Sequence, residues 1–222
     1  MRILYHLPLS PQSRLARLSL SERRIPFETR VENVWESGED FLALNPAREV
    51  PVLVEEYGLA VPGGSVIAEY LEEAYTGATL LGHTLEERIE TRRLLNWFDV
   101  KFHNEVSRNL LGEKVDKRIS GRGTPDGTAI RAGYANLRFH LDYIGWLSET
   151  RAWLGGAQLT YADLAAAAHL SCLDFIGDID WSRAPFAKDW YARVKSRPSF
   201  RALLHDKLPG FTPPPYYMDL DF

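Results

Sequence analysis

Hydrophobic residues in the first third of the chain fall into short β-rich runs and short helical runs. RILYHL at 2–7 predicts a strand, and the Pro- and Ser-rich PLSPQS predicts a turn after it. Apolar residues at helical spacing then predict a helix that begins at Ser13 and is ended by Pro26. Beyond it the pattern predicts a strand over 27–33, a short helix over FLAL, a hairpin over EVPVLVEEYGLAV and a helix over GGSVIAEYLEEAY. This order indicates a small α/β domain.

The β signal disappears after the first third, and long amphipathic helices follow. Apolar residues step by three and four from Leu95 to Leu110 and again from Ile130 to Leu147, which predicts two long helices. The polar, Gly-rich stretch between them, 112–127, predicts a loop. WLGGAQLTYADLAAAAHLSCLDF predicts a helix buried on all sides, and two shorter helices follow it. We therefore expect an α/β domain over 1–77, an all-helical domain over 84–207 and an extended Pro-rich tail over 208–222.

Composition and charge exclude several classes of function. The formal net charge is -4 at pH 7, so binding to nucleic acid through phosphate neutralisation is not expected. No apolar run is long enough to span a bilayer, and the N-terminus has no signal-peptide layout. Cys172 is the single cysteine, which fits a reducing compartment and a buried, inert thiol. We expect a cytoplasmic protein without membrane insertion. The histidines share no metal-ligand spacing, so no metal site is expected.

Four local motifs occur in order along the chain: SPQSRLARLSL, NPAREVPVL, GGSVIAEYLEE, and WLGGAQLTYADL with WYARVKSRPSF behind it. Together, at these intervals, they resemble the glutathione transferase family over residues 1–205. The resemblance implies a thioredoxin-like N-terminal domain, an all-helical C-terminal domain and a homodimer. In TYAD, Thr160 and Asp163 predict a capping box. Asp163 is therefore expected to stabilise the fold and not to take part in catalysis.

The resemblance also implies a glutathione site, and this chain alters it. Pro51 is expected to follow a cis peptide bond, which would turn the backbone of Val50 toward an extended tripeptide. Ser65 is expected at a helix start that favours a carboxylate. The family usually places an acid before this serine, where the chain has Gly64, and Arg48 stands where glycine is common. An ammonium without its counter-charge binds poorly, so we expect at most weak glutathione binding and no efficient conjugation.

The hydroxyl that would stabilise a thiolate falls at Ser10 or Ser13, with Tyr5 as an outside candidate. The structural alternative assigns Ser10 to the turn and Ser13 to the N-cap of the following helix. Both interpretations stay open. If the chain is an enzyme, it is a glutathione transferase or isomerase that acts on a small electrophile through one of these two serines.

The chain ends in LPGFTPPPYYMDLDF, which is too short and too rich in proline to add a helix. The prolines favour an extended polyproline rod. Beyond them Met218, Leu220 and Phe222 alternate with Asp219 and Asp221, so an extended tip has one apolar and one acidic edge. The tail either folds back over an apolar groove or presents a peptide-like ligand to a partner.

Within the family, a missing acid combined with an acidic, aromatic tail resembles non-catalytic bacterial cell-division members that bind the tubulin-like filament protein FtsZ and curve or bundle its filaments. That resemblance implies FtsZ filaments as partner and a location at the division site. Three candidate contact surfaces follow: the tail tip (Asp219, Leu220, Asp221, Phe222), the polar stretch with Glu113, Lys114 and Arg118, and Trp35 in VENVWESGED. Trp35 is either an exposed anchor or buried over the domain junction. A two-fold dimer would carry each contact twice and could cross-link filaments.

Overall fold

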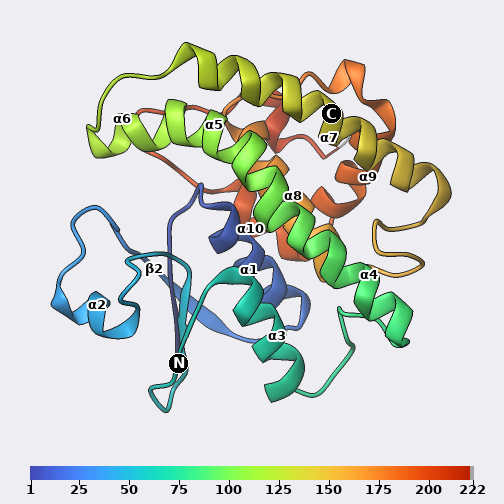
Figure 1. Cartoon of the computed structure of the whole chain (residues 1–222). Coiled ribbons are helices and arrows are strands. Elements are labelled where there is room, and N and C mark those ends of the chain that lie inside the picture. Colours follow the sequence, from blue (N-terminus) through green and yellow to red (C-terminus); the bar gives the residue numbers. More distant parts are fainter. Residues whose placement is uncertain (221–222) are drawn as a thin grey trace.

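The N-terminal part of the computed structural model is a thioredoxin-like layer of one sheet and its helices (Figure 1); the structure describes residues 1–220. The sheet has the strand order β2-β1-β3-β4. Its strands are β1 (Arg2–His6), β2 (Phe27–Val31), β3 (Val52–Val54) and β4 (Ala60–Pro62). β1 runs parallel to β2, and the β1–β3 and β3–β4 pairs are antiparallel. The helices of this part are α1 (Pro11–Glu22), α2 (Glu39–Leu44) and α3 (Gly64–Ala74).

Helix α1 begins earlier than the sequence pattern predicts. Ser10 is the N-cap, because its Oγ accepts a hydrogen bond from the Ser13 N–H at 3.2 Å. Pro11 takes the first helical position, where a missing N–H breaks no hydrogen bond and the fixed φ suits the helix. The assignment of Ser13 as N-cap and of Ser10 as a turn residue is therefore wrong. The Ser10-Pro11 pair is therefore a stronger signal for the start of the helix than Ser13 is.

One continuous helical rod crosses the molecule in green in Figure 1. It consists of α4 (Leu85–Asn96), the π-helical segment η1 (Trp97–Ser107), α5 (Arg108–Leu111), the π-helical segment η2 (Gly112–Asp116) and α6 (Lys117–Ser120). The predicted loop over 112–127 is thus wrong for its first nine residues. Val115 is buried, and Lys117 pairs with Glu113 one turn earlier, so the polar residues form the solvated face of a helix. Gly121, with φ 66°, ends the rod in the left-handed conformation.

The remaining helices surround a buried central one. They are α7 (Gly127–Thr150), α8 (Tyr161–Phe175), η3 (Trp181–Arg183), α9 (Pro185–Lys195), η4 (Pro198–Phe200), α10 (Arg201–Leu204) and η5 (Pro215–Met218). Every residue of α8 is buried, as its predominantly apolar sequence predicts. α8 packs against α1, α4, η1 and α9, so it joins the two parts of the chain. The thioredoxin-like domain followed by an all-helical domain is the fold that the sequence predicts.

The tail does not extend away from the helical domain. Pro214 has polyproline dihedrals, but the turn η5 follows it at once. Tyr217 in this turn is fully buried, and its ring lies edge-on to Phe175 with centroids 5.3 Å apart. The predicted extended tail is therefore wrong for the described residues, because burying an aromatic side chain outweighs the preference of the prolines for a projecting rod. Asp221 and Phe222 lie outside the described residues.

Asp163 holds the start of α8 as the capping motif predicts. Its Oδ2 accepts from the Thr160 N–H at 3.0 Å. Its Oδ1 accepts from the Leu154 N–H at 2.7 Å and from the Trp190 indole N–H at 3.0 Å. The Thr160 hydroxyl also donates to Oδ2 at 3.0 Å, so one buried carboxylate satisfies four donors from three different segments.

Replacing this carboxylate should destabilise the fold strongly. In Asp163→Ala four buried donors lose their acceptor, so we expect the free energy of unfolding to fall by about 3 kcal/mol or more. Urea denaturation followed by circular dichroism measures it. Asp142→Ala, at an exposed position of α7, is the matched control and should change stability by less than about 0.5 kcal/mol. Equal losses in both variants would contradict the assignment.

Candidate functional site

A cleft of about 380 Å³ lies between the two domains. The N-terminal domain contributes the segment Leu7–Gln12 at the start of α1, Val34 and Trp35, and the segment Arg48–Val50. The opposite wall is the inner face of the helical rod, with His103, Ser107, Arg108, Leu111, Val115, Asp116 and Ile119, and Leu208 lies at the root of the tail. Burial raises the pKa of Asp116 to about 6. The cleft thus combines apolar walls with both cationic and anionic groups.

Only part of the expected glutathione site faces this cleft. The Val50–Pro51 peptide bond is cis, as the resemblance implies, and the Pro51 carbonyl accepts from the Gly63 N–H at 2.8 Å. Val50 lines the cleft, whereas Pro51 and Ser65 are not among its lining residues. Ser65 lies in the first turn of α3, behind the Gly63 N-cap. The three positions are neighbours in the fold, but they do not form one surface of the cleft.

Gly64 is closed in by the start of α1. A Cβ atom built on Gly64 would lie 2.4 Å from Gln12 Oε1 and 2.8 Å from the Gln12 backbone oxygen. The backbone contact is closer than real Cβ atoms allow and cannot be relieved by a side-chain rotation. The acid that the family usually places here is therefore excluded by the packing of α1 against Gly64.

Arg48 occupies a backbone conformation that favours glycine. Its φ is 56°, in the left-handed region. The neighbouring Asn45 holds this turn, since its side-chain oxygen accepts from the Ala47 N–H at 3.2 Å and its amide donates to the Glu49 carbonyl at 2.9 Å. A non-glycine residue in this region costs about 1–2 kcal/mol. Despite this cost, the turn places the long cationic side chain of Arg48 in the cleft wall.

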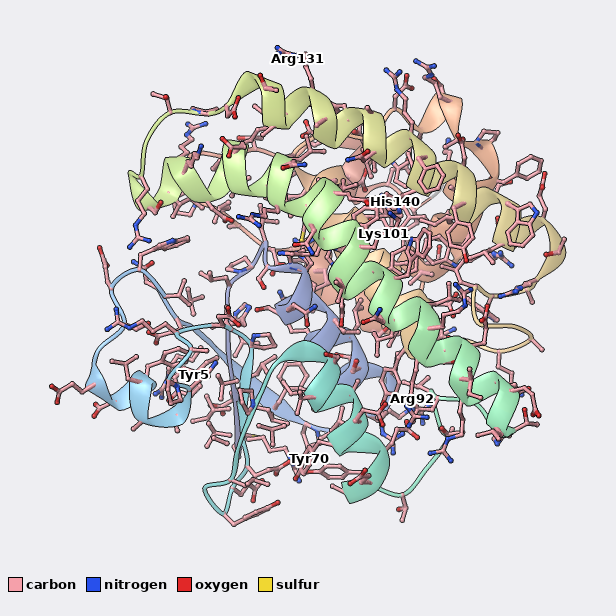
Figure 2. All side chains as sticks on the ribbon, in the orientation of Figure 1. Tyr5, Tyr70, Arg92, Lys101, Arg131 and His140 are labelled. Carbon is pink, nitrogen blue, oxygen red and sulfur yellow. The ribbon has the colours of Figure 1, made fainter. Side chains whose placement is uncertain are left out.

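The candidate hydroxyls differ in access to the cleft. Ser10 lines it while capping α1. Ser13 is fully buried, and its Oγ accepts from the Leu7 N–H at 3.3 Å. The Tyr5 hydroxyl lies within hydrogen-bond distance of Arg30 Nη1 at 3.0 Å, and its ring packs near Phe41 beside α2 (Figure 2). Ser10 is thus the one of these three hydroxyl residues that lines the cleft.

No sequence motif predicts the cluster of polar groups at the helical wall of the cleft. Ser107, which lines the cleft, has its Oγ 2.7 Å from Nδ1 of the buried His169. His169 Nε2 lies 3.9 Å from Asp99 Oδ1. Burial lowers the pKa of the cleft residue His103, and the nearby His169 adds to the effect. These residues share no recognisable motif, because the long rod and α8 bring them together only in the folded chain.

Of the expected partner-contacting residues, Trp35 lines the cleft, and the others lie on the rod and in the tail. Trp35 is half-buried and lines the cleft. It therefore lies at the domain junction and also keeps part of its surface exposed. Glu113 accepts from Lys117 at 2.5 Å and from the Asp126 N–H at 2.7 Å, which ties the loop after α6 to the rod. Lys114 pairs with Asp178 and donates to the Tyr134 hydroxyl at 3.0 Å.

Arg118 joins this end of the rod to the tail. Its guanidinium lies over the Phe211 ring, 4.7 Å from the centroid. Asp219 is exposed, and Leu220 is partly buried against the helical core. Because Ile119 and Leu208 both line the cleft, the end of the rod and the root of the tail lie together on one side of it. The structure thus brings together residues that are far apart in the sequence.

Comparison with known proteins identifies the family. A profile for the glutathione S-transferase N-terminal domain matches residues 4–79. FtsZ-localized protein A of Caulobacter vibrioides is 48% identical over 224 residues, covering 100% of this chain and 98% of that protein. The chain belongs to the glutathione S-transferase family.

Solved structures agree with this assignment. A glutathione S-transferase from Rhodospirillum rubrum has a TM-score of 0.97 and 52% identity, with both chains covered completely. FzlA from C. crescentus has a TM-score of 0.96 and 48% identity, and the match covers 100% of this chain and 99% of that one. Family membership and fold are therefore secure.

Two features common in other proteins do not occur in the described residues. Across 1–220, no group of three or more His, Cys, Asp or Glu side chains could hold a metal ion. In the same range no helix has the length and apolar character needed to cross a membrane.

Restoring the family's acid should not restore a glutathione site. We expect Gly64→Glu to give no binding heat with millimolar glutathione, and Gly64→Ala to lose about 1–3 kcal/mol of stability, because any Cβ collides with the Gln12 backbone. Titration calorimetry and urea denaturation measure the two effects, and Ser65→Ala is the neighbouring control. Glutathione binding by Gly64→Glu would show that α1 can move aside.

Proposed function

We propose that this chain is a glutathione-transferase-fold protein without efficient transferase activity that binds FtsZ and curves or bundles its filaments at the bacterial division site. The observation that carries the proposal is the identity of 48% along the whole chain with FtsZ-localized protein A. The match extends through the C-terminal tail, where glutathione S-transferase motifs impose no constraint.

The geometry of the cleft argues against efficient conjugation. Gly64 cannot carry an acid, Ser13 is inaccessible, and Ser65 does not line the cleft. A transferase needs to bind glutathione and stabilise its thiolate at one place. Ser10 and the cis peptide bond at Val50 are the features that favour the alternative, a transferase or isomerase acting on a small electrophile.

The partner surface that we propose surrounds the mouth of the cleft. It comprises Trp35, the rod end with Glu113, Lys114 and Arg118, and the tail tip beginning at Asp219. The Arg118–Phe211 contact holds the rod end against the root of the tail. A half-buried tryptophan beside a mixed-charge rim resembles the anchor and rim of protein interfaces.

We further propose that the protein acts as a homodimer. The rod and α7 pack side by side, as the labels of Lys101 and His140 show in Figure 2. Large apolar side chains on these two elements are exposed: Val100 by 50%, Phe139 by 57% and Trp146 by 57%. Exposed apolar patches of this kind mark contact surfaces. A dimer would present two filament-binding surfaces and so could bridge or bend filaments.

Removing the tail tip should abolish filament binding without unfolding the protein. A chain lacking residues 219–222 keeps the buried Tyr217, so we expect its melting temperature to fall by less than about 2 °C. Its co-sedimentation with polymerised FtsZ should be lost. A chain lacking 216–222 also loses Tyr217 and should be destabilised by about 3–5 kcal/mol. It therefore cannot serve as the test on its own.

Single substitutions separate the three parts of the surface. Trp35→Ala and Arg118→Ala should each weaken co-sedimentation, and Arg88→Ala, exposed near the start of α4, is the control. Sedimentation of the 219–222 deletion at the level of the whole chain would remove the tail tip from the surface. If no form sediments with FtsZ, the transferase alternative should be tested with Ser10→Ala and a small electrophile.

The dimer proposal makes its own prediction. Val100→Glu combined with Phe139→Glu should convert a dimer into a monomer, because two carboxylates cannot be buried unpaired in an apolar interface. Size-exclusion chromatography with light scattering measures the mass. Ile119→Glu, on the cleft wall, is the control and should remain dimeric. A wild-type chain that is monomeric at micromolar concentration contradicts the proposal.

A further inference from the structure

One buried guanidinium connects the cleft with the tail. Arg14 lies on α1 and is fully buried. Its Nε donates to the Pro8 carbonyl at 2.7 Å, and its Nη1 donates to Ser171 Oγ at 2.8 Å and to the Tyr217 hydroxyl at 3.2 Å. Its Nη2 pairs with Asp206 at 3.1 Å. The side chain thus contacts four segments of the chain at once.

Two contacts of Arg14 lie in separate regions, the one with Pro8 at the cleft and the one with Tyr217 in the tail. Pro8 is part of the loop that lines the cleft. Tyr217 is in the turn that begins four residues before the proposed contact tip, and its hydroxyl also donates to the Leu203 carbonyl at 3.2 Å. Arg14 is therefore a direct physical link between the wall of the cleft and the root of the tail tip.

The hydrogen bonds of Arg14 are costly to break because its charge is buried. A guanidinium in the interior has to satisfy its donors, and each unmade hydrogen bond to a charged group is expensive. Asp206 is shared between Arg14 and Arg17, whose Nη1 lies 2.8 Å from the same oxygen. One carboxylate thus serves two arginines, so the neutral acceptors Pro8 O and Tyr217 Oη matter to the solvation of Arg14.

The helical domain holds the same turn from the other side. Lys195 is fully buried and donates to the Tyr216 carbonyl at 3.2 Å. Its Nζ also lies 5.6 Å from the centre of the Tyr217 ring. Tyr217 is therefore held between one cation of the helical domain and one of the N-terminal domain. A movement of α1 relative to the helical domain changes one of these contacts and not the other.

We propose that Arg14 is a positioning residue through which the cleft regulates the tail. A molecule that displaces the segment Leu7–Gln12, which is the loop after β1 and the start of α1, withdraws the Pro8 carbonyl from Arg14. Arg14 then shifts, its hydrogen bond to Tyr217 weakens, and the tail turn opens more often. The effect on the turn is a property of the chain itself, whereas its consequence for filament binding rests on the function proposed above.

The single native cysteine makes a clean test possible. Cys172 is fully buried, and burial raises the pKa of its thiol to about 11, so the native chain should not react with a maleimide at neutral pH. Gln12→Cys places a reactive thiol in the cleft wall, and N-phenylmaleimide attached there fills the space beside the loop. Glu149→Cys, at the exposed end of α7, carries the same label far from the cleft as the matched control.

Hydrogen exchange of two tail amides is the readout. The Tyr217 N–H donates to the Pro214 carbonyl at 2.9 Å, and the Asp219 N–H donates to the Tyr216 carbonyl at 3.1 Å. Labelling Gln12→Cys should speed the exchange of both amides about fivefold, which is the effect of losing one hydrogen bond. The label at Glu149→Cys should change neither amide. Unchanged exchange after labelling at Gln12→Cys would overturn the proposal.

Two further variants test whether the effect passes through Arg14. In Arg14→Met the label at Gln12→Cys should no longer alter the tail amides, because the link is cut. Tyr217→Phe removes only the hydroxyl, so it tests the same link in a chain that keeps its core. A label effect that persists in both variants would refute the role of Arg14.

Filament binding then separates this inference from the proposed function. If labelling speeds the exchange and no form sediments with FtsZ, the coupling stands and the proposed function fails. If the unlabelled Gln12→Cys chain sediments and labelling changes neither exchange nor sedimentation, the coupling fails and the proposed function stands. Loss of sedimentation on labelling Gln12→Cys, but not Gln12→Cys with Tyr217→Phe, would support both.

Discussion

The packing of α1 against α8 is the contact on which the other features of this structure depend. α8 presents the run Ala165–Ala168, whose small side chains allow a neighbouring helix to approach closely. The two helices belong to different domains, and no other pair of named elements within residues 1–220 makes a larger contact. Their packing sets the domains at one angle, which opens the cleft on one side and brings Arg14 to Ser171 on the other.

The same helix α1 explains why this chain has no acid at the position of Gly64. The start of α1 lies so close to α3 that Gln12 fills the space beside Gly64. The change is one of packing, and it reaches beyond a single missing carboxylate. The scaffold keeps its cis proline and its capping box, whereas the residue before Ser65 is a glycine with no room for a Cβ atom.

The tail combines a buried residue and exposed residues in one short segment. Tyr217 is a core residue, and Met218 and Asp219 directly after it are exposed at the surface of the helical domain. Anchoring lowers the conformational entropy that a partner would have to remove on binding. A weak contact can therefore be sufficient when a dimer presents it twice.

The sequence by itself determined the fold class and most of the elements. Helical periodicity predicted the first part of the rod and α7, the mostly apolar run predicted the buried α8, and TYAD predicted its cap, because each of these signals lies within a single segment of the chain. The candidate site was predicted less completely than the fold. Ser10 could be named as a candidate, but its capping role and its exposure to the cleft needed the structure, and the polar segment after Gly112 looked like a loop until the burial of Val115 was known.

Only the tertiary structure decided the position of the tail and the link through Arg14. Arg14 is 157 residues from Ser171 and 203 residues from Tyr217 along the chain. An arginine on an amphipathic helix looks like any solvated charge, and a tyrosine after three prolines looks like part of an exposed peptide. Their burial against each other depends on how α1 and α8 pack, and no pattern within a single segment carries that information.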